Sequence, residues 1–167
     1  LENLGSRENI LKAKLEICQG LPDGAPLVLN GDDALLRGAA LPARLKPVWF
    51  SLQETGADVC AADIRDEADG TSFTLRDEEH GDFPVHIPTR GLHTVSDALA
   101  AYAAATRLGL DPARAAAALS DYKTTGMRQN LVQHSGVTFI EDCYNASPDS
   151  MRAALDILRR QVPGPQG

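Results

Sequence analysis

Basic residues are too few in this sequence for a general nucleic-acid-binding protein. Lys and Arg number 16 against 23 Asp and Glu, which gives a formal net charge of -7. A nucleic-acid binder needs a basic surface to displace the counterions of its ligand, so we expect no nucleic-acid partner. Long apolar runs are also missing, and no signal peptide opens the chain. We therefore expect no membrane span.

Cysteine and histidine form no metal-binding pattern along the chain. The three cysteines are Cys18, Cys60 and Cys143, and there is no CxxC or Cys/His cluster of the kind that binds zinc. An odd, unevenly spaced set of cysteines favours a reduced, cytoplasmic protein. His80 and His86 have no partner at a catalytic spacing, and we expect both to lie on the surface.

The overall amino-acid composition is typical of a soluble globular protein. Hydrophobic residues make up 43% of the chain and charged residues 23%, which excludes a disordered protein. The 167 residues are enough for one ordinary domain or for two incomplete ones.

Alternating strand and helix patterns predict an α/β fold. Short apolar runs predict strands at residues 26–30, 48–52, 59–64, 72–75, 83–87, 131–132 and 137–140. Capping residues and helical spacing predict helices at residues 6–20, 34–37, 95–108, 111–119 and from 148 onward. We expect the first of these helices to pack in the core.

Two polar segments that follow predicted strands are candidate sites. Asp32 and Asp33 could bind a metal or a ribose, but capping of the short helix that follows is the favoured interpretation. The second segment, residues 141–147, lies between a strand and a helix that Ser147 and Pro148 would begin. Such turns carry ligand chemistry in α/β proteins. The alternative is a polar connection at a sheet edge.

Three segments together resemble the signature of the Mur ligase family. They are Gly-Met-Arg at residues 126–128, Asp-Cys-Tyr-Asn-Ala-Ser-Pro at residues 142–148, and Gly-Leu-His-Thr-Val-Ser-Asp-Ala-Leu-Ala-Ala at residues 91–101. The resemblance implies that residues 1–123 are the second half of a central ATPase domain, a mixed sheet with helices. Residues 124–167 would then begin a Rossmann-like C-terminal ligase domain.

The resemblance also implies an activity, cofactors and partners. Mur ligases phosphorylate the carboxylate of a UDP-linked peptide with ATP and Mg²⁺, and an amine then attacks the acyl phosphate. The resemblance is strongest to the branch that joins D-Ala-D-Ala to UDP-MurNAc-tripeptide in peptidoglycan synthesis. A cytoplasmic monomer is expected.

Residue by residue, the resemblance assigns a wall of the nucleotide site to this chain. Arg128 would reach the phosphates or ribose of ATP, a task that suits a permanently charged, forked donor. Asp142 would accept from ribose hydroxyls. Tyr144 and Asn145 would face the nucleotide or the substrate, although Tyr144 could equally serve the strand-to-helix turn alone.

The adenine side of the site departs from the family pattern. His93 matches it, but Thr94 and Asp97 stand where asparagines are usual, and Ser147 replaces another asparagine. A carboxylate at position 97 accepts hydrogen bonds but cannot donate to a ring nitrogen. Asp97 could instead serve only the first turn of its helix, where negative charge is favourable.

Other parts of the family's machinery are expected outside this sequence. No Gly-Lys dipeptide, and hence no P-loop, occurs in it. The family's metal-binding histidine would fall one residue before Leu1. We therefore expect the isolated chain to be inactive. A sister Mur-type amino-acid ligase, a non-catalytic nucleotide-binding or interaction module, and a purely structural domain remain as alternatives.

Overall fold

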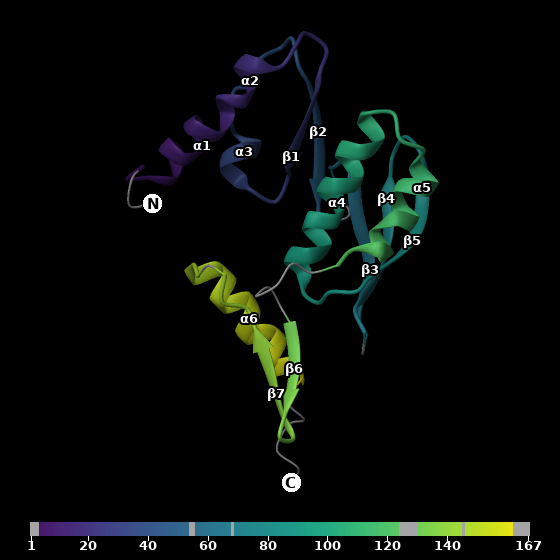
Figure 1. Ribbon diagram of the computed structural model, residues 1–167. Coiled ribbons are helices and arrows are strands. Elements are labelled where there is room, and N and C mark those ends of the chain that lie inside the picture. Colours follow the sequence, from purple (N-terminus) through teal and green to yellow (C-terminus); the bar gives the residue numbers. More distant parts are fainter. Residues whose placement is uncertain (1–3, 54–55, 68, 124–129, 145, 162–167) are drawn as a thin grey trace.

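A five-stranded mixed sheet forms the larger part of the protein (Figure 1). The structure is a computed structural model that describes residues 4–53, 56–67, 69–123, 130–144 and 146–161. The strands, in their spatial order, are β1 (Pro26–Asn30), β2 (Lys46–Ser51), β3 (Val59–Asp66), β4 (Thr71–Asp77) and β5 (Gly81–Ile87). β1, β2 and β3 run parallel, β4 pairs antiparallel with β3, and β5 pairs antiparallel with β4. The expected α/β class is confirmed.

The main core lies on the face of this sheet that two helices cover, α4 (Leu92–Arg107) and α5 (Pro112–Ala118) (Figure 1). β4 shows why, because its residues alternate between buried and half-buried along its whole length. Phe73 and Leu75 point into the core, whereas Ser72 and Thr74 point to the other face. Strict alternation of this kind is typical of a strand with one packed face.

Helix α4 owes its place on the sheet to an apolar stripe. Its buried residues recur at helical spacing: Val95, Ala98, Leu99, Tyr102, Ala103 and Thr106. The helix begins three residues before the predicted start, because Gly91 enters it with a φ of 101° and Thr94 Oγ1 donates to the Gly91 carbonyl at 2.8 Å. A positive φ costs glycine little, which explains the residue type at this entry.

A second layer packs on the opposite face of β1 and β2. It consists of α1 (Arg7–Leu15), α2 (Ile17–Gly20) and α3 (Ala34–Arg37). Its own small core is Cys18, Leu27, Leu29 and Leu45. Ser6 caps α1 as expected, accepting from the Asn9 N–H at 3.2 Å. The expectation that this first helix packs in the core holds at its C-terminal end only. α1 has no fully buried residue, but Leu15 is partly buried against this small core, and Cys18 of α2 is buried in it.

The C-terminal part forms a separate two-stranded sheet with one helix. Its elements are β6 (Asn130–His134), β7 (Val137–Glu141) and α6 (Pro148–Gln161). Ser135 and Gly136, with φ values of 50° and 78°, make the tight turn of the hairpin. Ser147 Oγ accepts from the Ser150 N–H at 3.1 Å, which confirms the predicted helix start. Within the described part of the chain, no helix has the length and apolar character that crossing a membrane requires.

Candidate nucleotide site

A pocket of about 340 Å³ opens beside the N-terminal half of α4. The helix contributes Thr94, Asp97, Ala98 and Ala101 to its wall. The alanines leave room because their side chains end at Cβ. The opposite side consists of residues from the end of β5 and from the short 3-10 helix η1 (Leu119–Asp121) and its surroundings: Ile87, Thr89, Leu119 and Tyr122.

The chemistry of this pocket suits a mostly apolar group that carries an amine. Most lining side chains are apolar, and Asp97 is the charged residue among them. Pockets that are mostly apolar with a few placed polar groups are the usual form of small-molecule sites. The Asp97 carboxylate can accept from an exocyclic amine but donates nothing. None of the lining residues is cationic, so the pocket alone offers no partner for phosphate.

The predicted site residues on α4 separate into two places. Asp97 and Thr94 line the pocket. His93 is exposed and does not line it; its ring lies over Gly91, where an added Cβ would be 2.9 Å from His93 Cε1. The same added Cβ would lie 3.3 Å from Ile157 Cδ1 of α6. His93 is therefore placed at the contact between α4 and α6.

Asp142 lies in a second, smaller hollow of about 220 Å³ between β7 and α6. The hollow also contains Ile140, Ser150 and apolar residues of α6. Tyr144, in the turn that follows, is 64% exposed. The structure thus places Asp142 against α6 and not among the residues of the α4 pocket. Arg128 and Asn145 lie outside the described residues.

Ile157 of α6 approaches Gly91, which precedes α4, close to the α4 pocket. Ile157 is 8% exposed, whereas other apolar residues on α6 are far more accessible, with Leu155 61% and Met151 57% exposed. Ile157 lies close to Gly91, so this part of α6 is near the end of α4 that carries Asp97.

The paired carboxylates after β1 are structural. Asp33 Oδ1 accepts from the N–H groups of Leu35 and Leu36 at 2.8 and 3.2 Å, which confirms it as the N-cap of α3. Asp32 accepts from Ser51 Oγ at 2.5 Å and from the Leu52 N–H at 2.9 Å, and so ties the ends of β1 and β2 together.

Tyr122 lines the α4 pocket, although the sequence did not mark it as a candidate site residue. It follows η1 and is half exposed. A single aromatic residue in the polar segment after a predicted helix is the one signal that could have pointed to it.

Comparison with known proteins shows the relationship directly. The family model for the Mur ligase middle domain matches residues 1–105. The UDP-N-acetylmuramoyl-tripeptide–D-alanyl-D-alanine ligase of Bacillus subtilis is 40% identical over 158 residues, which cover 94% of this chain and 33% of that protein.

Solved structures of Mur ligases also resemble this chain. A crystal structure of MurF from Acinetobacter baumannii matches with a TM-score of 0.85 and 31% identity, over 95% of this chain and 34% of that one. The fold is also shared with MurF from Thermotoga maritima in complex with ADP, with a TM-score of 0.78 and 24% identity, over 94% of this chain and 36% of that one. The chain spans about a third of the length of these relatives. It belongs to the Mur ligase family.

Proposed function

We propose that this chain is part of an ATP-dependent ligase that joins D-Ala-D-Ala to UDP-MurNAc-tripeptide. The observation that carries the proposal is the 40% identity to the Bacillus subtilis ligase of that activity. The pocket on α4, where Asp97 and two alanines of the family-like segment meet Tyr122, is the candidate site for its nucleotide. The ligase relatives, one of them described in complex with ADP, support it. ATP with Mg²⁺ would convert the peptide carboxylate into an acyl phosphate, which the dipeptide amine then attacks.

The residues of this chain would hold the adenosine end of ATP. The apolar walls fit the faces of adenine, and Asp97 fits its exocyclic amine. Because no lining residue is cationic, the phosphates need charge from elsewhere. We assign that role to Arg128 together with groups outside this chain, and ribose binding to Asp142.

We also propose that the chain divides into two functional units, residues 1–123 and 124–167. The five-stranded sheet and the β6–β7 hairpin are separate sheets, in keeping with this division. A nucleotide site between them would be completed or opened by their relative movement, as in other enzymes whose domains close on substrate.

Phosphate release by the full-length protein that carries this chain tests the proposed activity. With ATP, Mg²⁺ and UDP-MurNAc-tripeptide, we expect D-Ala-D-Ala to raise the rate by at least about tenfold, because the acyl phosphate turns over only when an amine attacks it; that factor equals about 1.4 kcal/mol of barrier.

The control reactions pair L-Ala with UDP-N-acetylmuramate, and L-Lys or meso-diaminopimelate with UDP-N-acetylmuramoyl-L-alanyl-D-glutamate, the UDP-linked substrates that the names of sister ligases give. A protein that responds to one of these amines instead would be a sister ligase. A protein that binds ATP but releases phosphate at one rate with every amine would be a non-catalytic nucleotide-binding module, and the proposal would fail.

A further inference from the structure

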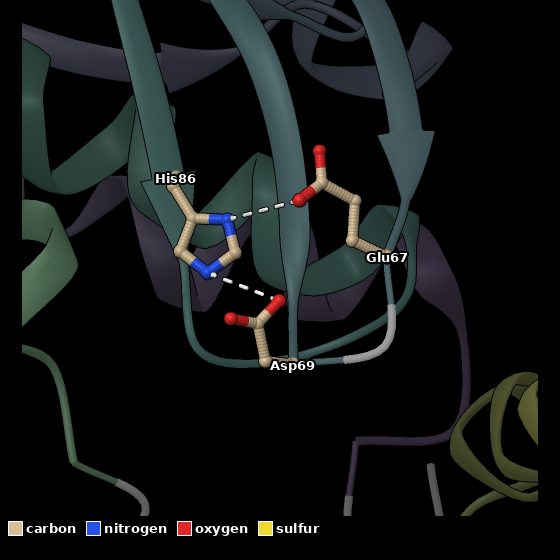
Figure 2. Close-up of side chains that lie close together, drawn as sticks. All are labelled: Glu67, Asp69 and His86. Atoms are coloured by element: carbon tan, nitrogen blue, oxygen red, sulfur yellow. Dashed lines mark ion pairs between the residues drawn. The ribbon is translucent and has the colours of Figure 1, made fainter.

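Three side chains able to bind a metal meet where β3 turns into β4, beside the end of β5 (Figure 2). His86 Nδ1 lies 3.9 Å from Glu67 Oε2, and His86 Nε2 lies 3.9 Å from Asp69 Oδ1. One ligand atom from each residue lies within 4.8 Å of the others. Alternation along β5 places His86 on the opposite face from Ile87, which lines the α4 pocket. The cluster is thus separate from the proposed nucleotide site.

Each carboxylate faces a different nitrogen of the His86 ring, and the gap between Nε2 and Asp69 has a size that one small cation can fill. A gap of 3.9 Å between ring nitrogen and carboxylate oxygen is too long for a direct hydrogen bond. Zinc binds histidine nitrogen and carboxylate oxygen at about 2.0–2.2 Å, so two such bonds span a gap of this size. Figure 2 shows the two carboxylates on either side of the imidazole.

The imidazole is held in place by two neighbours outside the cluster. Ser72, paired with His86 across β4 and β5, has its Oγ 3.1 Å from His86 Nδ1. Gly70 lies under the ring, because an added Cβ would be 2.9 Å from His86 Nε2. Metal-binding histidines usually have their second nitrogen hydrogen-bonded in this way, which fixes the ring and its tautomer.

These contacts indicate which ring nitrogen would bind the metal. With Nδ1 occupied by Ser72, Nε2 is the coordinating atom, and Asp69 is the carboxylate already beside it. The Glu67 side chain is 47% exposed and can turn toward the same point. Three protein ligands leave a coordination position for water or an anion. Glu67 and His86 also line a groove of about 370 Å³, together with Arg65.

We propose that Glu67, Asp69 and His86 bind a divalent transition-metal cation, with zinc as the ion that suits one imidazole and two carboxylates. The test uses the 167-residue chain, stripped of metal with a chelator and titrated with Zn²⁺ alone against a chromophoric chelator. Co²⁺, whose visible absorption reports coordination by protein ligands, provides a second readout on the same samples.

His86→Gln is expected to weaken zinc binding by at least about tenfold and to remove the Co²⁺ absorption, because it deletes the nitrogen ligand. Ser72→Ala, which leaves every ligand in place, should weaken binding by about 10–100-fold. His134→Gln is the matched control, since His134 is an exposed histidine on β6 outside the cluster.

Circular dichroism of the metal-free variants shows whether each one is folded. Should His86→Gln and His134→Gln bind zinc equally tightly, the ion lies elsewhere and the assignment is wrong. It is also wrong should the unaltered chain bind no zinc at all.

Discussion

Replacing Gly70 by alanine is expected to destabilise the protein by at least about 2 kcal/mol, because a methyl group has no room there. The new Cβ would lie 2.1 Å from the Ile87 carbonyl oxygen, a backbone atom at the end of β5 that cannot turn aside. The His86 ring blocks the other direction, 2.9 Å away. The strands β4 and β5 would have to separate at this end. Urea unfolding of the 167-residue chain measures the loss.

Gly20→Ala is the matched control for this change. Gly20 ends α2, and no atom lies within 4 Å of an added Cβ there. Its replacement should change the free energy of unfolding by less than about 1 kcal/mol, and in the stabilising direction. Equal stability of the two variants would show that β5 does not pass over Gly70 as described.

The second large effect is expected at Asp77, a buried carboxylate at the turn between β4 and β5. Its Oδ2 lies 2.9 Å from His80 Nδ1 and 3.4 Å from Arg107 Nη1, at the C-terminal end of α4. Asp77→Asn keeps the Oδ1 that accepts from the Glu79 N–H but removes the charge that Arg107 faces. We expect a loss of about 2–3 kcal/mol at pH 7, the usual cost of depriving a buried charged group of its partner.

This loss should depend on pH in a defined direction. Burial alone would raise the pKa of Asp77, but hydrogen bonds from His80, the Glu79 N–H and Arg107 outweigh it and hold the pKa below 3.8. A carboxyl whose folded pKa is depressed stabilises the protein above its unfolded pKa, and this contribution disappears as the pH falls through the folded value. The difference between the two proteins should therefore be fully present above the unfolded value of 3.8 and shrink as the pH falls below it.

Asp82→Asn provides the comparison for this pH series. Asp82 is an exposed aspartate, 3.6 Å from Arg76, and an exposed pair of this kind contributes about 0–1 kcal/mol. A pH dependence for Asp77→Asn no larger than for Asp82→Asn would contradict the buried arrangement at Asp77.

The elements that the sequence predicts well are those decided by neighbouring residues. The start of α6 at Ser147 and Pro148 depends on a hydrogen bond between residues three positions apart. The caps at Asp33 and Asp111 depend on backbone N–H groups two or three residues away. Local patterns carry such information because donor and acceptor are fixed relative to each other by the chain itself.

The clusters that the sequence did not predict depend on how distant segments pair. Arg107 and Asp77 are 30 residues apart, and Glu67 meets His86 only because β4 and β5 pair in the observed register. Shifting that register by one residue would turn His86 to the core face, so no local pattern reveals its partners. His80 and His86, which we expected on the surface, each lie beside a carboxylate for this reason.

The residues that line the α4 pocket differ in the same way in how far a single sequence indicates them. Asp97 could be assigned from its segment, whose helix places it in the pocket. Tyr122 reaches the pocket only through the packing of η1 and α5 against α4 and β5. Its participation depends on tertiary structure, which a single sequence does not display.

The most direct test of the account is ATP binding by the full-length protein after the α4 pocket has been filled. Ala101→Trp puts an indole into the space assigned to adenine, and Ala113→Trp puts the same group on an exposed position of α5 outside the pocket. Isothermal titration calorimetry should show ATP affinity at least about tenfold weaker for the first variant, a loss of about 1.4 kcal/mol, and unchanged for the second. Equal ATP affinity in both variants would mean that the adenine does not bind beside Asp97.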